Sequence, residues 1–562
     1  MKKLILFTVF STVCWRYVNC DFINPLNFIR VERAVTIPDE NITIEVSPQL
    51  LTKAGQWVNL TWYNPNPDAG DWIGAYLDFY NNGSINPVAH TPFKFQYTSY
   101  YAANGSKNGS CQFQLVNMRQ RVVFGFFTGN VSNPRLRAIS TPVEFINPNE
   151  ILQVHLAQGH SNSEMIVVWS TKNTTNNVVC YGDRVTAVNC VKANVSTYSA
   201  SDLCGSPANS TGWSDPGKII SATMTDLKPS TRYYYVLGSE QSSFSRQFSF
   251  KTPPNPSPDA VTNMIAFGDM GFGHVDGTNA YTRYLENPSI NTSKLIYEQI
   301  NAGKADIVLH IGDLSYANGY SAEWDEFFYQ IEPIASQVPY MVCDGNHEMD
   351  SPDSSAYYQG HDSGGECGVP YERRFIMPRP SPTKHWYGFD YGNIHVVMMS
   401  TEHDFTTNSE QHTFLDNHLK NVNRSITPWL IFAGHRPMYV DSTDDKKNSS
   451  DQPVATLLRQ HVEPLLKKYG VNLAFWGHNH SYQRTCLVFN ETCTNNGITH
   501  VVIGMGGAHL SDNVMSKTPA WMKVQDREHW GYSSIRTTKD QLEFQYIRDT
   551  DGIVHDYFTL KM

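Results

Sequence analysis

The stretch from Ile307 to Tyr316, IVLHIGDLSY, decides how the rest of the chain is interpreted. An apolar run rich in β-branched residues stops at Gly312, and Asp313 and Tyr316 follow within one turn. Such a run predicts a buried strand, and the residues after it can form either an ordinary Asp-capped turn or a functional site. This stretch alone favours the two interpretations equally, so other strand ends have to separate them.

Four more predicted strands end in the same way, with a glycine directly before a side chain that can bind a metal. The five ends are Gly268-Asp269-Met270-Gly271, Gly312-Asp313 through Tyr316, Gly345-Asn346-His347-Glu348, Gly434-His435-Arg436 and Gly477-His478-Asn479-His480. Glycine permits the sharp turn that each end needs, and sites in parallel sheets form beyond the carboxyl ends of the strands. The five ends therefore predict one shared site on one largely parallel, helix-flanked sheet.

The residues before this region follow a different pattern, in which short strands alternate with Asn, Gly and Pro turns. They predict two β-sandwich domains, over residues 40–147 and 150–253. In the second, Leu227-Lys228-Pro229 followed by Tyr233 resembles the fibronectin type III pattern, where a tyrosine ties a corner to the backbone. Pro253 to Asp259 is the expected linker. Alternating strands and helices then predict an α/β domain over residues 260–485, with its C-terminal part at 486–562.

The composition fits a globular chain of several domains, with 562 residues of which 40% are hydrophobic and 17% charged. The 43 Lys and Arg against 53 Asp and Glu give a net charge of -10, which argues against nucleic acid as the main partner. Residues 1–20 predict a secretory signal peptide, because the apolar run after Lys2-Lys3 is shorter than the roughly 20 residues of a membrane span. No later segment is apolar enough to span a membrane.

Glycosylation sequences and cysteines also fit an exported chain. The Asn-x-Ser/Thr triplets begin at Asn41, Asn59, Asn82, Asn104, Asn108, Asn130, Asn173, Asn194, Asn209, Asn291, Asn423, Asn448 and Asn490. Cys486 and Cys493 are close enough in sequence to close a small loop by a disulfide. The other pairings stay open, and Cys343 at the end of an apolar strand suits a buried thiol.

The set GD-x-G, GD-x-x-Y, GNH-E, GH-R and GH-x-H, in this order, resembles the metallophosphoesterases. Tyr316 makes the chain similar to the purple acid phosphatases among them. The two β-domains and the stretch from Asp362 to Pro370, DSGGECGVP, resemble the long plant-type subgroup. The resemblance covers essentially the whole mature chain, and it implies that residues 260–485 form a metallophosphoesterase catalytic domain.

The family's metal ligands carry over to the matching positions. The resemblance implies Fe(III) held by Asp269, Tyr316 and His480, a divalent ion held by Asn346, His435 and His478, and Asp313 bridging both. Ferric iron prefers carboxylate and phenolate oxygens, whereas two imidazoles and an amide suit zinc, manganese or ferrous iron. The implied chemistry is hydrolysis of phosphate monoesters by a hydroxide shared between the metals, without a phospho-enzyme.

Substrate contacts are the less defined part of the predicted site. His347 is expected to donate to a phosphate oxygen or to protonate the leaving group, next to Asn346. Glu348 suits a capping acid better than a catalytic one. The histidines that the short plant enzymes carry after the fourth motif are missing here, which leaves Arg436, His403 and His361 as candidates. Arg436 can equally brace the fold by an ion pair, and the two histidines can be structural.

The sequence thus predicts a secreted acid phosphatase whose partner is a phosphate ester or a nucleotide. One alternative is a nucleotide pyrophosphatase/phosphodiesterase on the same metals, and another is a non-catalytic surface glycoprotein with a vestigial metal site. A lysosome-like compartment is the alternative destination after export. The oligomeric state stays open, with a homodimer among the options.

Overall fold

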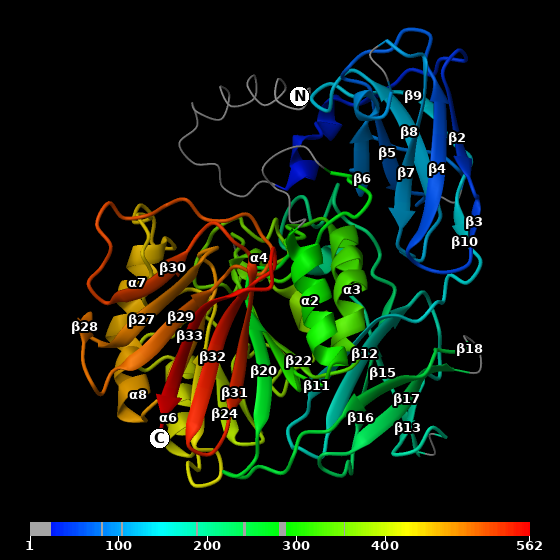
Figure 1. Cartoon of the computed structure of the whole chain (residues 1–562). Helices are drawn as coiled ribbons and strands as arrows, with labels where there is room; N and C mark the ends of the chain where they lie inside the picture. Colours follow the sequence, from blue (N-terminus) through cyan, green and yellow to red (C-terminus); the bar gives the residue numbers. More distant parts are fainter. Residues whose placement is uncertain are drawn as a thin grey trace.

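The computed structural model describes residues 24–79, 82–102, 105–186, 189–239, 243–279, 288–352 and 354–562. The predicted signal peptide over residues 1–20 and the glycosylation candidate Asn104 lie outside them. Two β-domains precede an α/β domain, as expected, and Figure 1 shows the first above helices of the α/β domain and the second beside it. No described helix is both long and apolar enough to cross a membrane.

The first domain is a β-sandwich. Its elements are η1 (Pro25–Phe28), η2 (Val31–Arg33), β1 (Val35–Thr36), β2 (Thr43–Ser47), β3 (Leu50–Leu51), β4 (Gln56–Tyr63), β5 (Trp72–Leu77), β6 (Lys94–Tyr97), η3 (Thr98–Tyr100), β7 (Asn108–Leu115), β8 (Val122–Thr128), β9 (Arg135–Ile139) and β10 (Glu144–Phe145). The sheets run β1-β9-β8-β5-β6 and β2-β4-β7, and β3 pairs with β10. Alternate residues of β2 and β4 are buried between the sheets, including Ile44, Val58 and Leu60. This period of two is the pattern of a half-buried strand.

The second domain is a fibronectin III-like sandwich. It contains β11 (Leu152–Gln158), β12 (Met165–Thr171), β13 (Val178–Gly182), β14 (Asn189–Lys192), β15 (Asn194–Ser196), η4 (Ala200–Asp202), β16 (Lys218–Met224), β17 (Arg232–Ser239), β18 (Ser243–Phe244) and β19 (Phe248–Lys251). One sheet runs β11-β12-β16-β15, and the other runs β14-β13-β17-β18 with β19 on β17. The Tyr233 hydroxyl accepts a hydrogen bond from the Lys228 backbone N–H at 3.0 Å, which confirms the expected tyrosine corner.

The third domain contains two sheets and the longer helices. The first sheet has β20 (Thr262–Phe267), β21 (Ile307–Ile311), β22 (Tyr340–Cys343), β31 (Gly531–Thr537), β32 (Gln541–Arg548) and β33 (Val554–Lys561). The second has β23 (Tyr387–Tyr391), β24 (Ile394–Met398), β25 (Trp429–Ala433), β26 (Leu473–Trp476), β27 (Tyr482–Phe489), β28 (Thr492–Cys493), β29 (Ile498–Ile503) and β30 (Met522–Asp526). The helices are α2 (Pro288–Asn301), α3 (Ser321–Ala335), α4 (Asn346–Met349), α5 (Val369–Arg374), α6 (Glu410–Lys420), α7 (Asp451–His461) and α8 (Glu463–Lys468).

The expectation of one largely parallel sheet is wrong, because the strands divide between two sheets. The first runs β22-β21-β20-β31-β32-β33, and the second runs β23-β24-β25-β26-β29-β27-β28. Phe475 of β26 and Phe544 of β32 meet between them, with ring centroids 6.2 Å apart. On β25, Ile431 faces this shared core, and its neighbour Phe432 packs in the cluster that contains Leu458 of α7. A continuous apolar run shows that both faces of a strand are buried, but it cannot show whether a helix or a sheet covers each face.

The strands that end in the five motifs nevertheless run in parallel within each sheet. β20, β21 and β22 are parallel neighbours in the first sheet, and β25 and β26 are parallel neighbours in the second. Their carboxyl ends therefore open at one edge of the sandwich, where the polar residues gather. The fold class predicted from the sequence, two β-sandwiches before a helix-flanked α/β domain, is confirmed.

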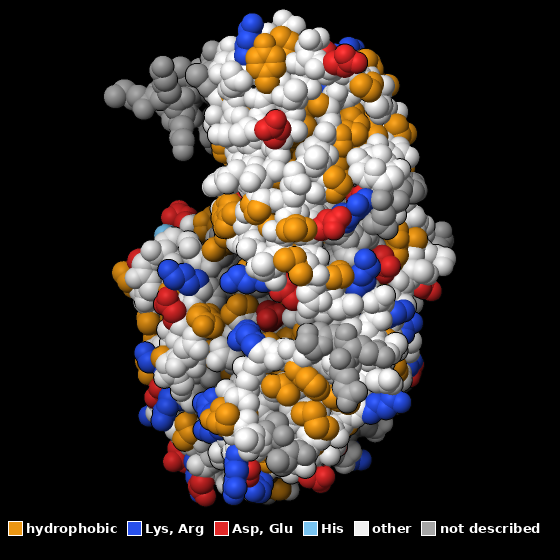
Figure 2. Space-filling view, turned by 90° about the vertical axis from the view of Figure 1, so that its right-hand side faces the viewer, with side chains coloured by type: hydrophobic (Ala, Val, Ile, Leu, Met, Phe, Trp, Pro, Cys, Tyr) orange, Lys and Arg blue, Asp and Glu red, His pale blue; other side chains and the backbone are white. Residues whose placement is uncertain are grey.

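Buried polar contacts and a disulfide join the domains. Arg119 of the first domain pairs with Asp325 of α3 at 2.8 Å, and the Tyr235 hydroxyl of the second donates to the Ser336 carbonyl at 2.8 Å. The Cys204–Cys367 disulfide links the second domain to the loop before α5. Figure 2 shows the first domain as a separate lobe, with Lys and Arg side chains interspersed among Asp and Glu side chains on this face.

The remaining cysteines and the glycosylation triplets have definite environments. Disulfides join Cys180 to Cys190 and Cys486 to Cys493, while Cys343 is a buried free thiol. The asparagines of all the described triplets are exposed.

Candidate dinuclear metal site

The five strand ends bring the seven predicted ligands into one buried cluster. Asp269, Asp313, Tyr316 and His478 all have positive φ angles, of 58°, 49°, 52° and 66°. This left-handed region is uncommon for non-glycine residues, and such strain concentrates at functional sites. At Gly345 a β-carbon would lie 2.2 Å from the Asp313 carboxylate, so only glycine allows the two strand ends to approach this closely.

One half of the cluster comprises Asp269, Tyr316 and His480. The Tyr316 hydroxyl lies 2.7 Å from His480 Nε2 and 3.3 Å from Asp269 Oδ1. His480 Nε2 lies 3.4 Å from the same Asp269 oxygen. These three side chains thus present a phenol, an imidazole and a carboxylate to one point.

The other half comprises Asn346, His435 and His478. Asn346 Oδ1 lies 3.0 Å from His435 Nε2 and 2.8 Å from His478 Nδ1. Asp313 Oδ2 connects the halves, because it lies 3.2 Å from His435 Nε2 and 3.3 Å from the Tyr316 hydroxyl. The structure therefore brings together both predicted ligand groups with Asp313 between them.

The outer ring nitrogens show which atoms face the centre. His435 Nδ1 lies 3.0 Å from the Ile311 carbonyl, and His480 Nδ1 lies 2.5 Å from the His509 carbonyl. A carbonyl only accepts, so each Nδ1 carries a proton, and the other ring nitrogen, Nε2, points toward the centre of the cluster. His435 Nε2 lies beside oxygens of Asn346 and Asp313, and His480 Nε2 lies beside the Tyr316 hydroxyl and an oxygen of Asp269. Imidazole nitrogens, carboxylate oxygens, an amide oxygen and a phenol that converge in this way are metal donors, so the residues fit a pair of metal ions.

The charges of the cluster fit the same conclusion. Burial opposes ionisation of Asp313, but His435 and His347 outweigh it and hold the pKa of this carboxyl well below its usual range. Burial, together with Arg436 and His435, holds the pKa of His478 well below its usual range. Burial lowers the pKa of His435, but Asp313 outweighs burial and raises it to about 10, so a metal bound by His435 would displace a proton.

His347 and Glu348 hold the turn that carries Asn346. The His347 backbone N–H donates to Asp313 Oδ1 at 3.0 Å, and its Nδ1 lies 2.8 Å from Asn318 Oδ1. His347 Nε2 lies 3.9 Å from Asp313 Oδ2 and so points toward the cluster. Glu348 accepts hydrogen bonds from the backbone N–H groups of Gly345 at 3.0 Å and of Asp313 at 3.0 Å, as expected for a capping acid.

Asp362 orients the amide of Asn346 and was not singled out from the sequence. Asn346 Nδ2 donates to Asp362 Oδ2 at 3.0 Å, which turns Oδ1 toward the two histidines. Asp362 is the first residue of the DSGGECGVP stretch, so this motif could have identified it as a functional residue. Asn318, which contacts His347, lies two residues after Tyr316. Its position directly after the GD-x-x-Y motif could have identified it.

Arg436 is committed to the protein rather than open to a ligand. Its Nε lies 2.9 Å from Glu402 Oε1, and one terminal nitrogen lies 3.0 Å from Asp350 Oδ2. The other donates to the Ser449 carbonyl at 2.5 Å. Only 2% of its side chain is exposed, so the guanidinium acts as an ion-paired brace.

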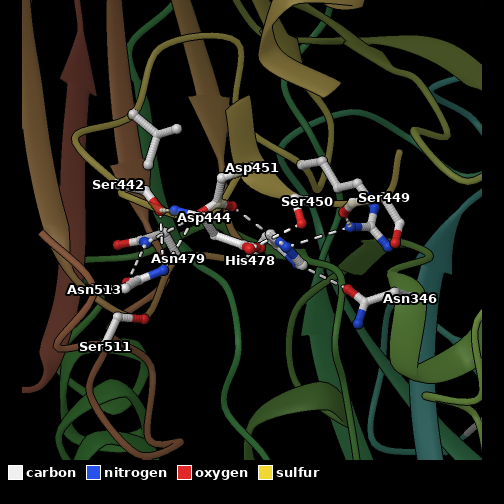
Figure 3. Close-up of polar contacts among 12 residues, drawn as sticks. Asn346, Ser442, Asp444, Ser449, Ser450, Asp451, His478, Asn479, Ser511 and Asn513 are labelled. Atoms are coloured by element: carbon white, nitrogen blue, oxygen red, sulfur yellow. Dashed lines mark hydrogen bonds and ion pairs between the residues drawn. The ribbon is translucent and has the colours of Figure 1, made fainter. Parts of the chain in front are cut away.

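The ring nitrogen of His478 that points away from Asn346 faces a group of polar residues from several segments. His478 Nε2 lies 3.5 Å from Asp451 Oδ1, and Asp451 belongs to a group with Ser442, Asn479 and Asn513. Figure 3 shows His478 with Asn346 on one side and this group on the other. Asp451 is thus the acid that faces the outward nitrogen of this predicted ligand.

His403 and His361 occupy other positions. His403 Nδ1 lies 2.8 Å from Ser400 Oγ and 3.6 Å from Asp344 Oδ2. His361 is exposed. The structure thus groups His403 with Asp344 and not with His347.

Four family profiles match successive parts of the chain. They are the Fn3-like domain from Purple Acid Phosphatase over residues 44–147, the Purple acid Phosphatase N-terminal domain over 151–252, the Calcineurin-like phosphoesterase over 263–482, and the Iron/zinc purple acid phosphatase-like protein C over 497–557.

Known proteins match over most of the chain. A protein of Arabidopsis thaliana named Probable inactive purple acid phosphatase 27 is 38% identical over 552 residues, which cover 92% of this chain and 89% of the relative. A Nucleotide pyrophosphatase/phosphodiesterase of Hordeum vulgare is 36% identical over 56% of this chain and 88% of its own. The structure of the purple acid phosphatase PPD1 from yellow lupin aligns with a TM-score of 0.86 at 35% identity, covering 93% of this chain and 96% of its own.

Proposed function

Because the chain belongs to the purple acid phosphatase family, we propose that it is an acid phosphatase that hydrolyses phosphate monoesters at a dinuclear Fe(III)-M(II) site. The ferric ion would be held by Asp269, Tyr316 and His480, and the divalent ion, zinc, iron or manganese, by Asn346, His435 and His478. Asp313 would bridge the two. When bound, such a metal pair activates water and neutralises phosphate charge.

One observation carries this proposal. The Nε2 atoms of His435 and His480 point inward at oxygens of the other predicted ligands, because backbone carbonyls hold their Nδ1 protons on the outer side. A vestigial site could keep the residues but has no reason to keep this arrangement. The observation therefore supports an active centre, although the Arabidopsis relative is named probable inactive.

The chain's own residues would orient the phosphate and supply a proton. Asn318 Oδ1 accepts a hydrogen bond from His347 Nδ1, so this ring nitrogen carries a proton. The ring is then either neutral, with a lone pair on Nε2, or protonated on both nitrogens. In the protonated form, Nε2 can donate to a phosphate oxygen or to the leaving alkoxide. The Asn318 amide is the positioning group, and Glu348 keeps the turn in place through backbone hydrogen bonds.

Substitution of Tyr316 by Phe tests the proposal. The phenolate of Tyr316 on ferric iron would give the purified protein a visible absorption band. Tyr316→Phe should remove that band, while circular dichroism shows an unchanged fold. Wild-type protein that contains no metal and shows no band would overturn the proposal and support the non-catalytic glycoprotein.

A second candidate, nucleotide pyrophosphatase or phosphodiesterase activity, is favoured by the charges beside the site. A monoester dianion needs more positive contacts than a diester monoanion, and Arg436 is already neutralised by Asp350 and Glu402. The Hordeum vulgare relative carries this activity in its name. Turnover of a bis-aryl phosphate compared with that of the mono-aryl ester, at equal metal content, separates the two candidates.

We also propose that the protein is exported and glycosylated, with the extracellular space as its destination and a lysosome-like compartment as the alternative. Three disulfides and the exposed Asn-x-Ser/Thr triplets support this. Recovery from the medium of a chain without residues 1–20, whose mass falls on deglycosylation, is the expected result. An intracellular chain that keeps residues 1–20 would contradict it.

A further inference from the structure

We propose that Asp344, His385 and His403 form a third, mononuclear site for a borderline divalent cation such as Zn²⁺. None of these three residues belongs to the seven ligands described above. The proposal does not depend on the activity proposed for the chain, because it concerns a different set of atoms.

Three segments that are distant in sequence meet at this point. Asp344 directly follows β22, His385 precedes β23, and His403 lies in the loop after β24. Their ligand atoms all lie within 4.8 Å of one another. Asp344 Oδ2 lies 2.8 Å from His385 Nδ1 and 3.6 Å from His403 Nδ1.

The spacing matches that of the dinuclear cluster. There, the atoms that face one another are separated by 2.7 Å in the pair Tyr316 and His480 and by 3.4 Å in the pair Asp269 and His480. Ligands about 2.0–2.1 Å from a zinc ion in tetrahedral geometry lie at comparable separations from one another. The three side chains are therefore arranged as closely as the predicted ligands of the same structure.

His385 is held between two carboxylates. Its Nε2 lies 3.1 Å from Glu372 Oε1, and its Nδ1 lies 2.8 Å from Asp344 Oδ2. A neutral imidazole has one N–H, so one of these contacts sets a lone pair against a carboxylate. If Nε2 carries the proton, it donates a hydrogen bond to Glu372. Nδ1 is then free to bind a cation that Asp344 also binds. A histidine ligand that donates its other N–H to a carboxylate is the common arrangement at zinc sites.

Asp344 supplies a second and independent observation. The residue is fully buried, yet its Oδ1 has no hydrogen-bond partner within the described chain. An unpaired buried carboxylate oxygen is costly, and a cation bound by both oxygens of Asp344 would remove that cost. The competing explanation is a buried imidazolium at His385 that pairs with both acids and leaves Oδ1 unpaired.

The remaining partners suit a site with one open position. Ser400 Oγ lies 2.8 Å from both Asp344 Oδ2 and His403 Nδ1 and can complete the donor set. The His403 side chain is 13% exposed, so a cation and water can enter from this side. One carboxylate and two imidazoles are donors that zinc accepts. A cation here would also fix the turn in which Asp344 precedes Asn346 by two residues.

Metal analysis of the full-length protein tests the proposal. Wild-type protein, His385→Gln, His403→Gln and His418→Gln are equilibrated with Zn²⁺, dialysed, and analysed for zinc and iron per chain. His418 is the matched control, because it lies 2.9 Å from His395 in a partly buried histidine pair that also contacts a carboxylate but is not a candidate cation site. We expect the His385 and His403 variants to lose about one zinc per chain and His418→Gln to lose none.

The iron content and the visible band separate this inference from the proposed function. A loss of zinc with unchanged iron and band supports the third site alone. A loss of zinc in a protein without band or iron supports the third site and contradicts the proposed function. Equal zinc in the wild type and in both cluster variants overturns the third site in favour of the imidazolium. If neither variant folds, the metal content of the wild type decides alone. A total of about two metals per chain, and not about three, also overturns the third site.

Discussion

Two buried polar clusters of this molecule both contain two acids, and they differ in the groups that face those acids. At the seam between the first domain and the α/β domain, Lys94 Nζ lies 3.1 Å from Asp276 Oδ2 and 3.1 Å from Glu326 Oε1. There a donor meets acceptors, and the chain itself completes the cluster. In the dinuclear cluster, imidazole nitrogens of His435 and His480 converge with carboxylate, amide and phenol oxygens. Burial and charge alone do not mark a functional site, whereas a convergence of metal-donor atoms does.

Asp313→Ala is the change with the largest expected effect. The bridging carboxylate is shared by both halves of the cluster, so the variant should lose metal and more than about 10³-fold in turnover, since one electrostatic contact of this kind is worth about 10²–10³. Metal analysis and kcat measure the effect. Asp276→Ala is the control, because it removes an equally buried acid at the seam. It should keep the metal and the activity of the folded fraction, and a loss of metal there would end the distinction between the clusters.

His347→Gln should cost about 10²–10⁴-fold in kcat, because it removes the proton donor that faces the cluster. The metal content should stay at the wild-type value, since no ligand is changed. The exposed His361 provides the matched control, and His361→Gln should leave kcat unchanged. Loss of metal in His347→Gln would show that this residue is a ligand and not a donor.

Lys94→Met tests how much the charged cluster between the first domain and the α/β domain contributes to stability. It leaves Asp276 and Glu326 buried without a counter-charge, which should destabilise the docked state by about 3–5 kcal/mol. Denaturant unfolding measures the loss, and specific activity of the folded fraction should be retained. A triple variant that replaces all three residues by apolar ones should recover most of the stability. Failure to recover would mean that the seam depends on these charges for more than neutralisation.

Glu326→Gln gives the smallest effect, and it depends on pH. Burial raises the pKa of Glu326 to about 7 from an ordinary value of 4.5, although Lys94 opposes the shift. The folded state thus binds this proton more tightly than the unfolded state. The stabilisation is full below pH 4.5 and is lost as the pH rises to about 7. Unfolding free energies measured across this window should fall in the wild type and fall less in the variant. Equal slopes would show that Glu326 does not titrate there.

Features that depend on residues close together in the chain could be predicted from the sequence. The glycine turns at Gly345 and Gly477, the convergence of the seven predicted ligands and the corner at Tyr233 all follow from local motifs or from a family resemblance. The division into two sheets was not predictable, because a strand such as β25 is apolar on both faces whichever layer covers it. Asp344, His385 and Glu372 were not predictable either, since their meeting depends on tertiary contacts between separate segments.

The disulfide between Cys204 and Cys367 has a consequence for how the chain folds in compartments of different redox state. It spans 163 residues, and the loop it anchors also carries Asp362, which turns the Asn346 amide inward. Closing a loop of this length removes about 5 kcal/mol of chain entropy from the unfolded state. Reduction of this disulfide would leave the loop held by non-covalent contacts alone. The orientation of the Asn346 amide should therefore be sensitive to the redox state of the compartment in which the chain folds.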